Sequence, residues 1–141
     1  MALPESGALL AEAWHAAFGR NPDPEEAYEK AIKAVEAAGA FVVSPKNSKA
    51  TLGTMIADMR NQRDWRLPTS VAGREQGHEV VLSMAEALWN GQGSRHGGNG
   101  YVKPTQEQGE AAVLLAVPLV HYFERGIVAR GERWPEPQKP A

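Results

Sequence analysis

The chain contains no cysteine among its 141 residues. This absence excludes a disulfide framework, a thiolate nucleophile and any zinc site built on cysteine. It is consistent with a reducing compartment, and we expect a cytoplasmic protein.

Long hydrophobic runs and a strong charge of one sign are also lacking. The longest apolar run, 111–120, is too short to cross a bilayer, so we expect no membrane partner. The first residues carry Glu5 and Glu12 where a signal peptide would be basic and apolar, so no secretion signal is expected. A formal net charge of −2 argues against bulk attraction to nucleic acid, but a local basic site is compatible with it.

Strict alternation of apolar and polar residues is missing, so no regular strand is predicted. Helical periodicity is present throughout, interrupted by Gly, Pro and Asn. We predict an all-α fold, a bundle of four or five helices in a single domain over residues 1–130. Its main loops are expected at 19–24 and 92–104, and the Pro-rich tail at 131–141 is expected to be disordered.

Helix boundaries follow from capping signals. The predicted helices span about 6–18, 24–38, 50–61, 74–89 and 105–125. Asp23 and Thr105 are the expected N-caps of the second and fifth helices, Gly39 is expected to end the second, and Gly126 the fifth. After Gly39, the segment "FVVSP" is predicted to be an extended connector or a short strand.

The last helix is predicted to be long and apolar. Residues 111–120 are apolar on every face, which predicts the central helix of the bundle. Pro118 removes one backbone hydrogen bond and is expected to kink this helix.

The segment "WNGQGSRHGGNGYVKP", residues 89–104, is the strongest candidate for a functional site. A connection between antiparallel helices normally needs only a few residues, and this one is long and rich in glycine. His96 titrates near neutral pH and could act as a general acid or base, while Arg95 could bind a phosphate and stabilise charge on it. Together they supply the groups needed for metal-free RNA cleavage, in which the 2′-hydroxyl attacks the adjacent phosphate. The alternative is a solvated loop in which Asn90 and Gln92 are only helix-end caps.

Other groups of residues give weaker signals. The four histidines, His15, His78, His96 and His121, show no metal-ligand spacing, so we expect no metal and no cofactor. Arg60, Arg63 and Arg66 recur every three residues around Trp65, which could bind phosphate or RNA or could form a solvated helix end. Glu36 lies on the charged side of its helix and calls for no special role.

A family resemblance is carried by the order of several segments. A helix with "AYEKAIKAVEAAG" is followed by "SPKNSKATLGTMIADM", a further helix, and a Gly-rich loop with His-Gly before the last helix. This order, over about residues 24–126, resembles the C-terminal domain of abortive-infection proteins in the HEPN superfamily. "KATLGTMI" and "GQGSRHGG" are the most distinctive parts.

The resemblance implies a HEPN-like bundle, a role in phage defence, and in many members a metal-independent endoribonuclease that works as a homodimer. His96 matches the motif histidine, Gly97 the glycine after it, and Asn90 the polar residue that follows the motif arginine. Trp89 occupies the arginine position itself, so Arg95 would have to supply the cation from beside the histidine.

Two functional hypotheses follow. In the first, His96 and Arg95 cleave RNA, and the polar residues Asn90, Gln92 and Asn99 contact the substrate. In the second, the domain is catalytically silent and dimerises or binds a nucleotide or a protein. Either hypothesis is compatible with a regulatory partner protein.

Overall fold

The structure is a computed structural model that describes residues 5–62, 65–68, 77–92 and 100–130, without the side chains of residues 66, 77 and 130. Five helices carry the fold: α1 (Glu5–Phe18), α2 (Pro24–Val43), α3 (Leu52–Asn61), α4 (Gly77–Asn90) and α5 (Gln106–Glu124). The extended pairing seen among these residues is two residues long and antiparallel, between β1 (Trp65–Arg66) and β2 (Ala129–Arg130). The prediction of an all-α bundle is therefore confirmed.

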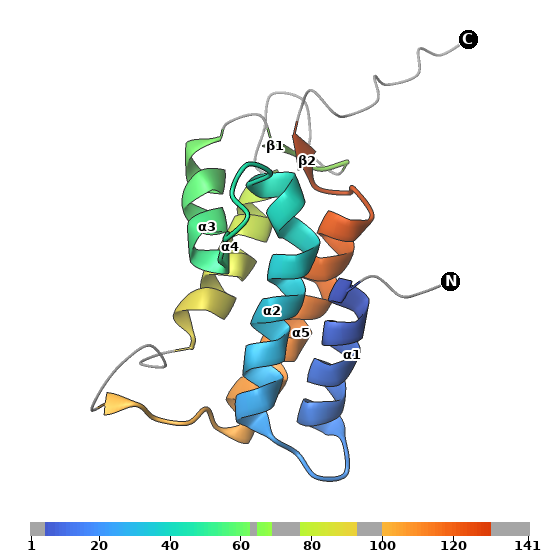
Figure 1. Ribbon diagram of the computed structural model, residues 1–141, viewed down its shortest axis with the longest axis vertical. Helices are drawn as coiled ribbons and strands as arrows, with labels where there is room; N and C mark the ends of the chain where they lie inside the picture. The colour runs from blue at the N-terminus through green and yellow to red at the C-terminus, as the bar shows by residue number, and fades with distance from the viewer. Residues whose placement is uncertain (1–4, 63–64, 69–76, 93–99, 131–141) are drawn as a thin grey trace.

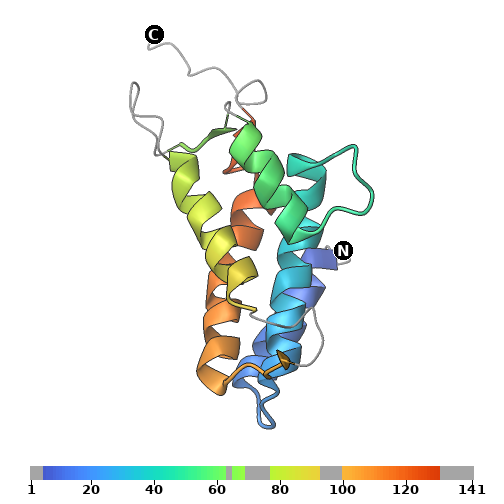
Figure 2. The same cartoon turned by 90° about the vertical axis from the view of Figure 1, so that its left-hand side faces the viewer.

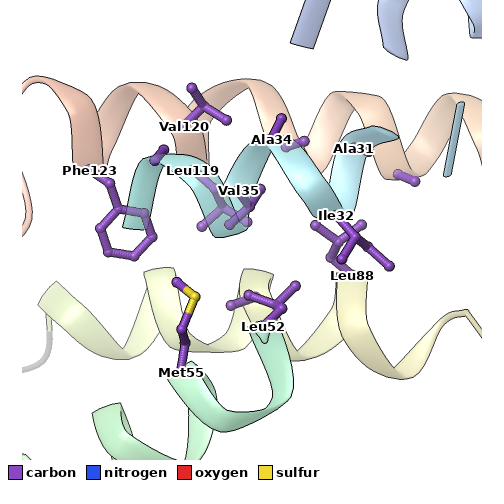
Figure 3. Close-up of a cluster of buried hydrophobic side chains, with 14 of the residues drawn as sticks. Ala31, Ile32, Ala34, Val35, Leu52, Met55, Leu88, Leu119, Val120 and Phe123 are labelled. Atoms are coloured by element: carbon purple, nitrogen blue, oxygen red, sulfur yellow. The ribbon is translucent and has the colours of Figure 1, made fainter. Parts of the chain in front are cut away.

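The helices form two layers that share one core, one layer made of α1, α2 and α5 and the other of α3 and α4. α2 and α5 lie side by side, α1 covers them on one side, and α3 and α4 cover them on the other (Figure 1). Turned by a quarter, the molecule shows α4 beside α5 and α3 beside α2 (Figure 2). The core cluster between the layers includes Val35 of α2, Met55 of α3, Leu88 of α4 and Leu119 of α5 (Figure 3).

Local capping chemistry sets the starts of two helices and the end of one. The Asp23 side chain accepts a hydrogen bond from the backbone of Glu26, with Pro24 at the first helical position, as predicted for α2. Thr105 and Gln108 form the predicted reciprocal capping box at the start of α5. At the other end of α5, Gly126 has φ +67°, the left-handed conformation that ends a helix.

Two sequence expectations for α2 were wrong. Gly39 does not end the helix, and "FVV" is not an extended connector, because α2 continues to Val43. A Cβ built on Gly39 would lie 2.6 Å from Cε of Met55 and 2.9 Å from Cδ2 of Phe123. Glycine is therefore present because α3 and α5 approach the helix closely there, and tertiary packing outweighs its poor helix propensity.

The prediction that the last helix is a long apolar helix enclosed on every face was wrong, because part of its apolar surface is exposed. Leu119 and Val113 are fully buried, whereas Leu114 is 54% exposed and Ala111 is also exposed. The helix continues through Pro118, and its contacts with other helices are to α1, α2 and α4. α2 contacts α1, α3 and α5, and α5 contacts α1, α2 and α4, so the two helices share the centre of the bundle.

In α1, Leu10, Ala13, Trp14 and Ala17 recur at helical spacing, but the structure does not bury all four of them. Ala13, Ala16 and Ala17 face the core, while Trp14 is 48% exposed and its ring stacks obliquely on Phe18 at 4.5 Å between centroids. Small alanines let α1 lie close to its neighbours, which leaves the large Trp14 ring on the outside.

The contact between the starts of α2 and α5 gives a testable prediction. A Cβ built on Gly109 would lie 2.9 Å from both Cα and Cβ of Pro24, and the proline ring cannot move aside. We expect Gly109→Ala to lower the free energy of unfolding by about 1–3 kcal/mol, although alanine is the better helix former. Gly100→Ala is the control because a Cβ there meets nothing within 4 Å. Urea denaturation of both variants measures the difference, and equal stabilities would contradict the close approach.

Candidate functional site

The end of α4 is fixed against α2 by a buried tyrosine. The hydroxyl of Tyr28 donates a hydrogen bond to the carbonyl of Leu88 over 2.6 Å. Because the last carbonyls of a helix lack partners within the helix, this bond satisfies one of them. Gly91 follows directly, and a Cβ on it would lie 2.5 Å from the Tyr28 hydroxyl. Tyr28 therefore sets where the Gly-rich segment leaves the bundle.

Trp89 packs on the first turn of α3. A Cβ built on Gly53 would lie 2.7 Å from Cζ2 of the Trp89 indole and 3.0 Å from its Nε1. Only glycine at position 53 leaves space for the ring. The residue at the expected arginine position of the HEPN motif is therefore used for packing between α3 and α4.

A surface pocket of about 350 Å³ lies beside this indole. One side is made by α2, from which Glu29, Ile32, Lys33 and Glu36 line it. The other side is made by Thr51, Trp89 and Gln92. We refer to it as the Trp89 pocket. It combines carboxylates, an ammonium, an amide and an aromatic wall in one hollow, at the point where the Gly-rich segment begins.

The charged side chains of the pocket are held by local bonds. Nζ of Lys33 lies 2.9 Å from Oε1 of Glu29, one helical turn earlier on α2. On the same helix, Nζ of Lys30 forms an ion pair with Oε2 of Glu12 on α1, at 3.0 Å.

Glu36 is a half-buried carboxylate at the base of α3. Its Oε2 accepts a hydrogen bond from the backbone N–H of Leu52 over 2.7 Å. Burial raises the pKa of the Glu36 carboxyl above its ordinary value, against the lowering effects of the Leu52 hydrogen bond and the positive charge of Lys33. From the sequence, Glu36 was expected to have no special role, because it lies on the charged side of its helix. The helical pattern cannot show that the start of α3 lies next to this carboxyl.

The raised pKa of Glu36 predicts how stability depends on pH. The Glu36 carboxyl binds its proton more tightly in the folded state than in the unfolded state. The protonated carboxyl therefore stabilises the fold below pH 4.5, and this contribution is lost as pH rises through the folded pKa. Glu36→Gln has no such titration and keeps an oxygen that can accept from Leu52. We expect the stability of the variant relative to wild type to increase between pH 4 and pH 7, as measured by urea denaturation at a series of pH values. A difference that is constant over this range would contradict the prediction.

The far end of the Gly-rich segment returns to the start of α2. The Tyr101 hydroxyl donates a hydrogen bond to Oε1 of Glu25, and Nζ of Lys103 lies 4.0 Å from Oε2 of the same carboxylate. Both described ends of the segment, at Gln92 and at Tyr101, are therefore placed along one helix. In the sequence, residues 93–99 separate these two ends, and they are outside the described part of the chain.

Several predicted site residues fall outside the described part of the chain. These are Arg95, His96 and Asn99, together with Gly97. Asn90 is exposed as the last residue of α4, and Gln92 lines the Trp89 pocket. One predicted substrate contact, Gln92, therefore lines the same pocket as three residues that the sequence had not placed in a site: Lys33, Glu36 and Thr51.

The arginine cluster around Trp65 does not form an aromatic surface for RNA. Trp65 is buried, and its Nε1 donates to the side chain of Gln62 over 2.9 Å. Arg60 is paired with Glu86 of α4 at 3.0 Å. Arg63 is outside the described residues. The described members of the cluster thus connect α3 to its neighbours.

Within the described ranges, no cluster of three or more histidines and carboxylates could hold a metal ion. His15 and His121 are exposed on different helices, α1 and α5. None of the described helices is long and apolar enough to cross a membrane.

Comparison of the chain with models of known families, with curated proteins and with solved structures finds no match. The class that the fold defines is an all-α bundle of five helices with a polar pocket at the edge of its two layers.

Proposed function

We propose that this chain is a HEPN-like ribonuclease of the abortive-infection type, which cleaves RNA without metal through His96 and Arg95. The observation that carries the proposal is the Trp89 pocket. It opens at Gln92, three residues before Arg95, and offers an aromatic wall and hydrogen-bonding groups to an unstacked base. Proteins that read single-stranded RNA use such a combination of stacking and hydrogen bonding.

In the proposed reaction, the RNA 2′-oxygen attacks the adjacent phosphorus and the bond to the 5′-oxygen breaks. The products are a 2′,3′-cyclic phosphate and a 5′-hydroxyl. His96 transfers a proton at one of the two oxygens, and Arg95 stabilises the negative charge that develops on the phosphate. The enzyme would act as a homodimer in the cytoplasm, as the resemblance implies.

The experiment is a cleavage assay on a labelled RNA of mixed sequence with the full chain, in the presence and absence of EDTA. Cleavage that persists in EDTA and leaves cyclic phosphate ends supports the proposal. A folded protein of known oligomeric state that leaves the RNA intact would contradict it.

A second function, a catalytically silent binding module, is favoured by one observation. The motif position where many HEPN ribonucleases carry arginine holds Trp89, and the indole of Trp89 is in contact with Gly53 of α3. A domain whose motif residue serves packing would bind a nucleotide or protein without cleaving it. Binding of RNA with no cleavage, at the same protein concentrations, would assign this function.

A further inference from the structure

We propose that the Trp89 pocket is a binding site for a guanine base, with Glu36 as the residue that selects it. The ligand chemistry is that of a flat ring with two adjacent N–H donors. The base can belong to a free nucleotide or to an RNA strand, and its place in an RNA strand rests on the function proposed above.

The shape and lining of the pocket fit a flat heterocycle. The indole of Trp89 forms one wall, and the largely buried side chain of Ile32 provides an aliphatic surface from α2. A volume of about 350 Å³ is at the lower end of the range for small-ligand sites. Bases stack on aromatic rings of this kind in many nucleic-acid-binding proteins, whatever their sequence preference.

The hydrogen-bonding groups supply the selectivity. Oε2 of Glu36 is anchored by the Leu52 N–H, which fixes the carboxylate in place and leaves Oε1 as an acceptor. An ionised carboxylate is an acceptor only, with about four lone-pair positions on its two oxygens. Guanine presents N1–H and N2–H side by side, both donors, whereas adenine and cytosine each present one donor beside an acceptor. Uracil presents a single donor between two acceptors. A carboxylate therefore matches the guanine edge better than the edge of any other base.

The remaining polar groups complete the match. The Gln92 amide lines the same hollow and has donors for the O6 carbonyl of guanine. The pocket is lined by two carboxylates, Glu29 and Glu36, and by one ammonium, Lys33. Because negative groups outnumber the positive one, a phosphate is not favoured as its main ligand. Lys33 is 51% exposed, so its ammonium can contact a phosphate attached to a base that occupies the pocket.

The test is a titration of the nitrogen-15-labelled full chain with the 5′-monophosphates of guanosine, adenosine, cytidine and uridine. The chain has four tryptophans, and loss of one indole N–H signal in Trp89→Phe identifies that of Trp89. We expect this signal to shift with guanosine monophosphate, with an affinity about tenfold or more above that for the other three. Equal affinities for the guanosine and adenosine nucleotides, or no shift at the Trp89 indole, would overturn the proposal.

Variants then test the role of Glu36. Glu36→Gln keeps an acceptor for Leu52 but replaces the other oxygen with an NH₂ donor that opposes the N–H groups of guanine. We expect guanosine monophosphate to bind about tenfold more weakly or worse, because a charge-assisted hydrogen bond is lost and two donors face each other. Glu107→Gln, with the same charge change at an exposed site on α5, should bind as wild type does. Gln92→Ala is the second variant, and unchanged binding in both pocket variants would overturn the assignment.

The outcomes separate this inference from the ribonuclease proposal. If guanosine monophosphate binds at Trp89 and RNA is not cleaved, the base pocket stands and the ribonuclease proposal fails. If RNA is cleaved equally after all four bases, and Glu36→Gln does not change the cleavage pattern, the ribonuclease stands and the guanine pocket fails. Comparison of a guanosine-containing oligonucleotide with the free nucleotide shows which source of the base is preferred.

Discussion

Substitution of His96 by alanine is expected to reduce metal-free RNA cleavage about 10²–10⁴-fold, the usual contribution of a general acid or base. The RNA 2′-hydroxyl is a poor nucleophile and the 5′-oxygen a poor leaving group, so both need proton transfer. The chain has no cysteine to supply it instead. Initial cleavage rates in EDTA, for wild type and variant at equal concentrations, measure the effect.

A matched control separates chemistry from folding. His15→Ala makes the same change at an exposed residue of α1, which lies on the other side of α2 and α5 from α4 (Figure 1). This variant should cleave as wild type does. Arg95→Ala is expected to lose about 10²–10³-fold, as when one charge-stabilising group is removed from an active site. Cleavage by His96→Ala at the wild-type rate would show that the residue is not the catalytic group.

The second large effect concerns the core under α5. We expect Leu119→Ala to lower the free energy of unfolding by about 2–5 kcal/mol, because the side chain is fully buried and its removal leaves a cavity. Leu119 faces Val35 of α2 in the cluster between the two layers (Figure 3). The same cluster includes buried side chains of α2, α3 and α4, and this packing should restrict how far the site can collapse. Denaturant unfolding, with an unchanged slope, would show a loss of stability without a change in exposed surface.

The control for this prediction lies on the same helix. Leu114→Ala removes the same atoms from a side chain that is 54% exposed, and its effect should stay within about 0.5 kcal/mol. A similar loss in both variants would mean that the outer face of α5 is covered in solution, as the sequence had suggested for an all-round apolar helix. The pair thus measures directly how much of α5 belongs to the core.

Features governed by near neighbours could be predicted from the sequence. Asp23 caps α2, Thr105 caps α5 and Gly126 ends it, because each of these depends on a side chain or a dihedral angle within one turn. The buried side of α3 also follows from local spacing, since its four buried apolar residues recur at helical intervals: Leu52, Met55, Ile56 and Met59.

Features that depend on distant segments could not be predicted. Gly39 has the local signature of a helix end, and only the approach of Met55 and Phe123 explains why the helix continues. Trp14 belongs by spacing to an apolar stripe, but the close packing of α1 selects its alanines instead. Glu36 shares a charged stripe with Lys33, and its role at the start of α3 depends on a contact sixteen residues along the chain.

The central positions of α2 and α5 have a consequence for local opening of the protein. The backbone amides of both helices are protected by three neighbours, since α1, α3 and α5 pack on α2, and α1, α2 and α4 pack on α5. The layer of α3 and α4 can separate from α2 and α5 while the α1–α2–α5 layer stays intact. Hydrogen exchange should therefore be slower in α2 and α5 than in the layer that contributes Trp89 and Gln92. The walls of the pocket would then belong to two cooperative units of different stability.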